Sequence, residues 1–367
     1  MAYTNIDDPS KHFQTVLWTG NTSAPRSITN DGNSDLQPDI VWAKNRTTNG
    51  TDHELYNSTM GTGTEQNLQP NNTNGKGTAT TYGQLTSFDT DGFTVNAGGT
   101  NDDKFNENNS EFVAWQWKVN GGTTSTNSDG NVSATVQANT TAGVSLVFYT
   151  GNGTQTGKTV GHGLGAVPKM IISKDRDGTS NVAAWRIYHE AIGATKYINL
   201  DTSNAGTFND WDNTTPTSSV YSIGGDGGYT PTNTNNTEYI AMVMTDVQGF
   251  SKMGSYVGNG NANGPFVYTG FKPAFVLAKN ITNSGYDWTI VDNKRSPANV
   301  VQKWIWANAS GPEYDGAGIS LHVDLLSSGF KIRSSRAEIN LNGATFIFMA
   351  FAENPFVTST GAPATAR

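Results

Sequence analysis

Apolar and polar positions along the chain repeat one pattern three times. Each copy begins with a proline, continues as an apolar run and reaches a lysine six positions after the proline; the copies span 38–44, 168–174 and 273–279. An unbroken apolar run of this length predicts a strand buried on both faces, and the proline marks its beginning. Three copies of one pattern at regular spacing predict three structurally related units.

Further motifs keep the same order around each copy. A strand that ends in a glycine turn precedes the copy, and one alternating apolar strand follows it. The preceding strands cover 16–21, 147–153 and 255–260, and the closing strands cover 112–117, 239–244 and 346–351. The closing strands begin 74, 71 and 73 residues after the corresponding prolines. Motifs that keep both order and spacing indicate internal triplication.

The distribution of turn residues favours an all-β protein. Short β-rich runs alternate with Gly, Asn, Asp and Thr, and helical periodicity is nearly absent. We therefore predict three tandem β-sandwich-like repeats of about 107 residues, with long Gly/Asn/Thr-rich loops. The predicted order is an N-terminal arm (1–11), repeat 1 (12–122), a linker with a lead-in strand (123–142), repeat 2 (143–249), repeat 3 (250–356) and a C-terminal tail (357–367).

Polar segments outside the apolar strands predict the surface of the molecule. Residues 1–11 lack a core pattern, so a frayed terminus is favoured over an attachment peptide. The composition of 121–131 is that of a flexible linker, which predicts that repeat 1 is more independent than repeats 2 and 3, which abut at 248–250. Two polar insertions in repeat 1, at 61–83 and 96–109, are expected to be surface loops and are candidate contact surfaces.

Charge and cysteine content exclude several classes of protein. The net charge is −8 and no basic stripe offsets it, so binding to a nucleic-acid backbone is not expected. The absence of cysteine rules out disulfides and thiolate metal sites. Without an apolar span of about 20 residues or an N-terminal apolar signal region, we expect a soluble protein, no membrane insertion, and release by a route such as cell lysis.

No residue set predicts catalysis. The chain has five scattered histidines, His12, His53, His162, His189 and His322. None of them occupies a repeated position, and no Gly-x-Ser-x-Gly elbow accompanies them. We therefore predict a protein that is not an enzyme and has no catalytic residues and no cofactor.

Two Asp-x-Asp-Gly segments, at 89–92 and 175–178, raise the question of calcium. Hard cations need several oxygen ligands from a turning loop, yet neither segment continues with the later ligands of a calcium-binding loop. Asp-Gly is also an ordinary turn signal, and repeat 3 has Ser327, Ser328 and Gly329 in the place of the first segment. We predict turns and no metal.

Exposed aromatic rings beside amides and carboxylates are typical of sugar-binding surfaces, and the chain has nine Trp and thirteen Tyr. The candidate surface-recognition residues are Trp211, Trp304 and Trp306, with burial in a core or a domain seam as the alternative. The repeated lysines Lys44, Lys174 and Lys279 are interpreted as structural, with packed stems and ammonium groups in water.

Several short motifs together resemble a known domain. They include the Tyr-Thr-Gly-Asn-Gly turn at 149–153 and the segments 160–165, 168–174, 193–197, 268–271 and 349–356. This set resembles a repeated domain of uncharacterised function in tail-fibre-like and other structural proteins of marine tailed bacteriophages. The resemblance covers about 12–356 and implies a virion protein, made in the host cytoplasm and released by lysis. It supplies no catalytic or binding residues.

The resemblance and the loop-rich β pattern together favour a tail fibre or spike that recognises a host-surface receptor or glycan without covalent chemistry. A decoration protein that stabilises the capsid or tail is the alternative, and a polysaccharide depolymerase is a weaker one. The expected partners are other virion proteins and a host-surface glycan or receptor. We also expect a homo-oligomer, because repeat 3 has more large apolar residues than one small sandwich needs. The resemblance implies a trimer, since host-facing phage fibres are commonly trimeric.

Overall fold

The computed structural model consists of strands and almost no helix, which confirms the predicted all-β class. It describes residues 2–63, 65–77, 82–98, 104–178, 183–202, 205–206, 209–225, 227–316 and 321–365. Helical structure in these ranges is limited to the 3-10 helix η1 (Pro9–Lys11) and the single-turn helix α1 (Ala337–Asn340).

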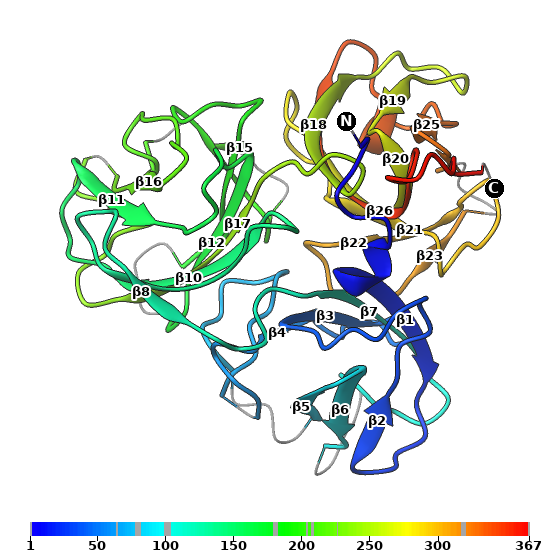
Figure 1. Ribbon diagram of the computed structural model, residues 1–367, viewed down its shortest axis with the longest axis horizontal. Coiled ribbons are helices and arrows are strands. Elements are labelled where there is room, and N and C mark those ends of the chain that lie inside the picture. Colours follow the sequence, from blue (N-terminus) through cyan, green and yellow to red (C-terminus); the bar gives the residue numbers. More distant parts are fainter. Residues whose placement is uncertain are drawn as a thin grey trace.

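The strands form three lobes around one centre (Figure 1). We call residues 12–122 lobe 1, 123–249 lobe 2 and 250–356 lobe 3. Lobe 1 contains β1 (Phe13–Thr19), β2 (Arg26–Ile28), β3 (Ile40–Asn45), β4 (Glu54–Asn57), β5 (Gln84–Asp89), β6 (Gly92–Asn96) and β7 (Glu111–Trp117).

Lobe 2 contains β8 (Ser125–Asn127), β9 (Ala134–Asn139), β10 (Val144–Thr150), β11 (Lys158–Gly161), β12 (Met170–Asp175), β13 (Arg186–His189), β14 (Tyr197–Asn199), β15 (Ala205–Gly206), β16 (Val220–Ile223) and β17 (Glu238–Met244). Lobe 3 contains β18 (Ser251–Val257), β19 (Phe266–Tyr268), β20 (Phe271–Asn280), β21 (Thr289–Asp292), β22 (Lys303–Trp306), β23 (Tyr314–Asp315), β24 (Val323–Leu326), β25 (Gly329–Ile332) and β26 (Thr345–Pro355).

One strand order recurs in the large sheet of every lobe. The strand that opens the lobe pairs with the strand that closes it, and the closing strand pairs with the proline–lysine strand. The matching orders are β1-β7-β3-β4, β10-β17-β12-β13 and β18-β26-β20-β21, and the smaller sheets are β2-β6-β5, β11-β16 and β19-β25-β24. The proline–lysine strands β3, β12 and β20 are therefore interior strands, as their apolar sequences predict.

The two faces of the proline–lysine strands lie against two different cores. In β3, Ile40 and Trp42 belong to a core shared by all three lobes, whereas Val41 and Ala43 belong to the core between the two sheets of lobe 1. Ile171 of β12 likewise lies in the internal core of lobe 2. Because successive side chains of a strand point to opposite faces, a strand between two cores needs an unbroken apolar run.

Aromatic rings join lobes 1 and 3 in the shared core. Phe13 stacks on Phe351 with ring centroids 5.2 Å apart, and Trp115 meets Phe275 edge-on at 5.7 Å. Lobe 2 contributes aliphatic and methionine side chains to the same cluster, Met242 among them. The prediction of a more independent first lobe is therefore wrong, since its large sheet is part of this common core.

A ring of hydrogen bonds also closes around the centre. The residue just before β4, β13 and β21 contacts a main-chain carbonyl of a neighbouring lobe in each case. These contacts join His53 Nε2 to Trp306 O (3.1 Å), Trp185 Nε1 to Gln69 O (2.9 Å) and Trp288 Nε1 to Asn199 O (2.7 Å). Lobe 1 thus binds lobe 3, lobe 3 binds lobe 2, and lobe 2 binds lobe 1.

A buried asparagine fixes the turn after each opening strand. The Oδ1 atoms of Asn106, Asn233 and Asn340 accept the main-chain N–H groups of Asn21, Asn152 and Asn259, at 3.1, 2.9 and 2.8 Å respectively. The residue before each of these N–H groups is a glycine. At Gly20, a Cβ atom would lie 1.9 Å from the Glu107 carbonyl oxygen, so the close approach excludes a side chain.

The repeated lysines are buried entirely, so the prediction that their ammonium groups lie in water is wrong. Lys44 Nζ donates to the carbonyl oxygens of Asn45 (2.7 Å) and Thr51 (2.8 Å). Lys174 Nζ reaches across to the Thr73 carbonyl of lobe 1 at 2.9 Å, and Lys279 is equally buried. The loop after each strand folds back, so that carbonyl oxygens replace water around the ammonium group.

The segment between lobes 1 and 2 is ordered rather than a flexible linker. The buried Asp39 carboxylate accepts the main-chain N–H groups of Val119 (2.6 Å), Gly121 (2.9 Å) and Gly122 (2.9 Å). Shortly afterwards, β8 pairs with β9 and extends the large sheet of lobe 2. A low apolar content predicted mobility here, but the carboxylate replaces the missing apolar contacts.

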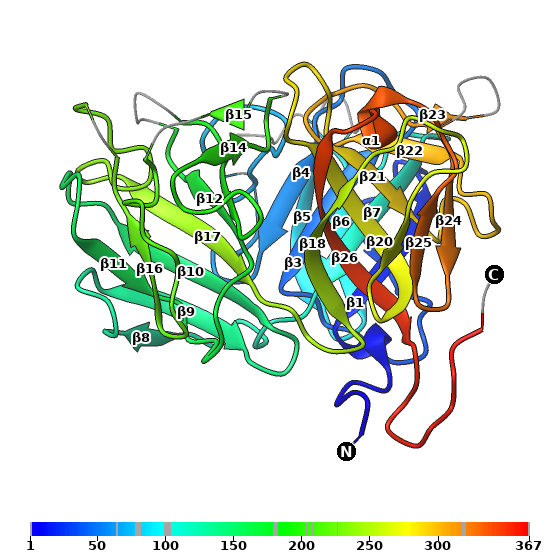
Figure 2. The same cartoon turned by 90° about the horizontal axis from the view of Figure 1, so that it is seen from above.

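The N-terminal arm is not frayed in its described part. Thr4 and Ile6 are buried, and Ile6 joins the shared core. The Asp7 carboxylate accepts the N–H of Ser359 at 2.6 Å, so the arm lies against the C-terminal tail on one side of the molecule (Figure 2).

Candidate functional site

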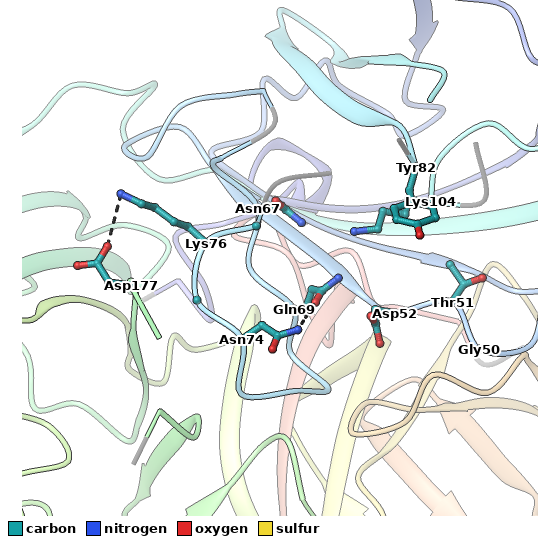
Figure 3. Close-up of a pocket in the computed structure, with 12 residues that line it drawn as sticks. Gly50, Thr51, Asp52, Asn67, Gln69, Asn74, Lys76, Tyr82, Lys104 and Asp177 are labelled. Atoms are coloured by element: carbon teal, nitrogen blue, oxygen red, sulfur yellow. Dashed lines mark hydrogen bonds and ion pairs between the residues drawn. The ribbon is translucent and has the colours of Figure 1, made fainter. Parts of the chain in front are cut away.

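A cavity with a volume of about 600 Å³ lies on lobe 1. Figure 3 shows its polar lining, which comes from the loop between β3 and β4, from both insertions of lobe 1 and from one residue of lobe 2. The lining residues are Gly50, Thr51, Asp52, Asn67, Gln69, Asn74, Gly75, Lys76, Gly77, Tyr82, Lys104 and Asp177. We call this cavity the lobe 1 pocket.

A buried carboxylate lies beneath the pocket. Glu54, the first residue of β4, binds Lys104 Nζ through Oε1 at 2.5 Å and accepts Asn67 Nδ2 through Oε2 at 2.5 Å. Gln69 Nε2 donates to Oε1 at 3.1 Å. Burial raises the pKa of Glu54, and the neighbouring Lys104 ammonium partly offsets that effect.

Tyr82 is the exposed aromatic residue of the lobe 1 pocket, with 44% of its surface open to solvent. The Lys104 ammonium nitrogen lies 5.7 Å from the centre of its ring, and the Lys104 N–H donates to the Tyr82 carbonyl at 3.2 Å. The cation lies within the range over which an ammonium group attracts an aromatic ring. Tyr82 and Lys104 therefore form one wall of the pocket.

Lobe 2 completes the opposite side. The Lys76 N–H donates to the Arg176 carbonyl at 2.6 Å, and Lys76 Nζ lies 3.4 Å from the Asp177 carboxylate. Asp52, the remaining carboxylate of the lining, accepts Asn71 Nδ2 at 2.6 Å. The pocket thus presents amides, carboxylates, ammonium groups and one aromatic ring to solvent.

The tryptophans predicted for surface recognition do not line this pocket. Trp211 and Trp304 are each only 1% exposed, so neither offers a ring to a ligand. Trp306 is partly buried, and its ring contacts Trp304 at 5.9 Å and Tyr314 at 5.6 Å. Trp211 packs inside lobe 2, and Trp304 belongs to the shared core, so the alternative of burial is correct for both.

Two of the tryptophans of lobe 3, Trp288 and Trp304, are covered within the same chain. Trp288 is 1% exposed and donates to lobe 2, as described above. These two tryptophans therefore give no reason for a second subunit. The trimer remains a prediction, but these tryptophans no longer support it.

Both Asp-x-Asp-Gly segments form turns held by their own side chains. Asp175 Oδ1 accepts the N–H groups of Asp177 and Gly178, both at 2.9 Å. Asp89 accepts the Ser87 and Thr94 hydroxyls, at 2.6 and 2.7 Å. Over the described ranges, no group of three or more His, Asp or Glu side chains is arranged to hold a metal ion.

Buried histidines are held in the neutral form. His53 Nδ1 accepts Trp42 Nε1 at 2.9 Å, so Nε2 carries the proton and donates to the Trp306 carbonyl. Burial lowers the pKa of His53 well below its ordinary value, and the Lys44 ammonium lowers it further. Burial lowers the pKa of His189 to about 4. Both histidines have structural roles here.

Sequence reasoning identified the segments of the lobe 1 pocket but not its residues. The insertions at 61–83 and 96–109 were expected to be candidate contact surfaces, and they supply most of the lining. They are not wholly superficial, since Asn67, Leu68 and Phe105 are buried. Only the fold brings Glu54 of β4 beneath them, because no local pattern pairs a strand residue with two distant loops.

Comparison with known proteins gives a family but no activity. No helix in the described part of the chain has the length and apolar character needed to cross a membrane. No curated protein matches the chain, and no solved structure matches it. A family model described as a domain of unknown function, DUF7483, matches residues 8–355 and so spans all three lobes. The chain belongs to this DUF7483 family.

Proposed function

We propose that the chain is a virion structural protein that recognises a host-surface glycan, without covalent chemistry, through the lobe 1 pocket. The observation that carries this proposal is the polar lining around exposed Tyr82. The resemblance to structural proteins of tailed bacteriophages supports the virion context. An all-β scaffold with loops that meet at one pocket is a common arrangement for binding sites.

The chemistry of the lining suits a carbohydrate. An aromatic ring packs against the C–H face of a sugar, and amides and carboxylates bind its hydroxyl groups. Asn74 and Asp52 supply such groups at the pocket surface, and Lys76 adds a cation for an acidic sugar. The reach of the pocket from lobe 1 to Asp177 of lobe 2 suits more than one sugar unit.

Binding of purified host envelope polysaccharide tests the proposal. Calorimetric titration should show saturable binding by the wild-type chain and at least a tenfold weaker affinity for Tyr82→Ala. Tyr229→Ala is the matched control, because Tyr229 is 60% exposed on lobe 2 and lies outside the pocket lining. Equal loss in both variants, or no binding by the wild type, contradicts the proposal. New reducing ends after incubation would indicate a depolymerase instead.

A role in decorating the particle is the second candidate, and three exposed large apolar residues of lobe 3 favour it. Val257, Phe266 and Tyr268 are 58%, 48% and 57% exposed. Tyr3 of the N-terminal arm reaches Tyr268, with their hydroxyl oxygens 3.3 Å apart. Exposed apolar side chains of this kind suit attachment to another virion protein.

Copy number and mass separate the assembly possibilities. Quantitative mass spectrometry of intact particles should find a few to a few dozen copies for a fibre or spike, and hundreds for a decoration protein. Light scattering of the purified chain tests the predicted trimer directly. A mass near 39.2 kDa, that of one chain, contradicts it.

A further inference from the structure

Three chemically complementary side chains meet beneath the lobe 1 pocket. The Glu54 carboxylate binds Lys104 Nζ with one oxygen and Asn67 Nδ2 with the other, both at 2.5 Å. The Lys104 side chain is 9% exposed, and Glu54 and Asn67 are each 1% exposed. A single carboxylate thus holds an amine and a primary amide side by side in a nearly dry environment.

The side-chain amide of Asn67 is buried, and within the described residues only its nitrogen is hydrogen-bonded. Asn67 Oδ1 is buried and accepts no hydrogen bond from any described residue. Gly77 packs on the same amide, and a Cβ at Gly77 would lie 2.8 Å from Oδ1. The same Glu54 carboxylate binds both the Lys104 amine and the Asn67 amide, so the two reacting groups are held together in one buried site.

We propose that Lys104 and Asn67 join in an intramolecular isopeptide bond, with Glu54 as the catalytic acid–base. The Lys104 ammonium passes a proton to the Glu54 carboxylate and becomes a neutral amine. Lys104 Nζ then attacks Asn67 Cγ, Glu54 passes its proton to Nδ2, and the Cγ–Nδ2 bond breaks with release of ammonia. Nζ gives its second proton to Glu54, which leaves a neutral secondary amide.

The step balances without an added reagent. An ammonium group, a carboxylate and a primary amide become a secondary amide, ammonia and one proton held by Glu54. Nothing is oxidised or reduced, and the chain loses the mass of one ammonia molecule. Burial raises the pKa of Glu54, which helps the carboxylate to accept the proton that the lysine must lose.

The register of the sheets limits this chemistry to lobe 1. Glu54 pairs with Ala43 of β3, and the corresponding residue in lobe 2 is Arg186, which pairs with Ser173 of β12. In lobe 3 the corresponding residue is Thr289. A guanidinium or a hydroxyl at this position cannot replace the carboxylate as a proton carrier, so the structure assigns one cross-link per chain.

The cross-link would tie together the two insertions that form the pocket. Asn67 belongs to the first insertion and Lys104 to the second, and 37 residues separate them in the sequence. A covalent bond between them restricts the unfolded chain and fixes the floor of the pocket. The proposal does not depend on what the pocket binds.

Peptide mapping of the purified wild-type chain tests the proposal. Trypsin does not cleave after an acylated lysine, so the cross-linked digest should contain the segments 47–76 and 77–118 joined as one branched peptide. Tandem mass spectrometry should locate the junction at Asn67 and Lys104, and the intact mass should be lower by one ammonia. Recovery of free 77–104 in full yield, with no branched peptide, overturns the proposal.

Ammonia loss alone is not sufficient, because Asn–Gly pairs such as Asn74–Gly75 can cyclise to a succinimide with the same mass change. Hydroxylamine separates the two products, since it cleaves succinimides and leaves secondary amides intact. A mass deficit that disappears with chain cleavage at Asn–Gly overturns the proposal. A deficit that persists, together with the branched peptide, supports it.

Two variants and one control define the roles of the residues. Lys104→Arg keeps a cation beside Glu54 but removes the nucleophile, and Glu54→Gln removes the proton carrier. Both should lack the branched peptide. Lys76→Arg changes the other lysine of the pocket lining and should keep the cross-link in full. A branched peptide in Glu54→Gln at the wild-type level overturns the role of Glu54, and the wild-type digest remains decisive if this variant does not fold.

Discussion

Lobes 1 and 2 place opposite charges at the same position of the same sheet. Glu54 of lobe 1 and Arg186 of lobe 2 each begin the strand that follows the proline–lysine strand, in the same register. Glu54 binds Lys104 at the floor of a pocket. Arg186 Nε instead lies 3.2 Å from the Asp210 carboxylate, and its guanidinium stacks 3.9 Å from the centre of the Tyr197 ring.

This difference separates two sets of features. We call the features that recur in the lobes the frame, and they are distinct from the chemistry found in one lobe alone. The buried lysines, the turn asparagines and the interlobe hydrogen bonds recur, because each satisfies a main-chain group that the strand order leaves buried. The charged residue at the start of β4 or β13 faces loops that differ in length and sequence, so its partner can change. Variants of the frame should therefore act alike in the lobes, and variants of the pocket should act in lobe 1 alone.

The largest expected effect on the frame is acid destabilisation through the buried histidines of lobes 1 and 2. His189 has a folded pKa of about 4, below the ordinary value of 6.5, so the unfolded state binds its proton first as the pH falls. Its contribution is present in full above pH 6.5 and is lost towards pH 4, at about 1.4 kcal/mol of unfolding free energy per pH unit.

Urea denaturation at a series of pH values measures this loss. His189→Asn keeps an acceptor for the Ala191 N–H, which Nδ1 of His189 binds at 3.1 Å, but does not titrate. This variant should show a shallower fall in stability between pH 6.5 and 4, while His53 continues to contribute. An unchanged slope would mean that His189 is protonated in the folded state.

Removal of a turn asparagine should have the next largest effect and should be similar in two lobes. Asn233 accepts the Asn152 N–H and donates Nδ2 to the Thr154 carbonyl at 2.7 Å. Asn233→Ala and Asn106→Ala should each lower the free energy of unfolding by about 2–3 kcal/mol, because they leave buried main-chain groups unpaired. Chemical denaturation measures both, with Asn283→Ala at an exposed position as the control. A large effect in one lobe only would refute a common frame.

Removal of one hydrogen bond from the ring between the lobes should lower the free energy of unfolding by a smaller amount. Trp185→Phe keeps most of the ring volume but removes the Nε1 donor to Gln69 O. The free energy of unfolding should fall by about 1–2 kcal/mol. Trp211→Phe is the matched control in the same lobe, because the buried Trp211 Nε1 has no hydrogen-bond partner among the described residues. If both variants lose equal stability, the interlobe hydrogen bond contributes nothing of its own.

The smallest effect on stability is expected in the pocket wall. Tyr82→Ala removes a ring that is 44% exposed, so the unfolding free energy should change by less than about 1 kcal/mol. The same variant should lose glycan binding, as proposed above. A large loss of stability would show that Tyr82 belongs to the frame and not to the pocket.

The sequence by itself determined the all-β class and the positions of the strands that bear the repeated motifs. Unbroken apolar runs such as residues 40–43, at the start of β3, predicted interior strands, because only a strand covered on both faces has no polar side to present. The Gly-Asn turns could also be predicted from the sequence, since glycine is required where main-chain atoms approach closely. The asparagines that bind these turns, Asn106, Asn233 and Asn340, recur six residues before each closing strand's first aromatic residue, a signal that the strand pattern does not contain.

Only the tertiary structure decided how the lobes associate and where the reactive groups meet. Strand patterns predict that a face is buried, but they do not say whether another lobe or another subunit covers it, which is why the large apolar residues of repeat 3 suggested an oligomer. The pairing of Glu54 with Lys104 and Asn67 depends on two loops folding over one strand. Electrostatic and hydrogen-bond partners of this kind are set by distances in space, and a single sequence carries no periodic signal for them.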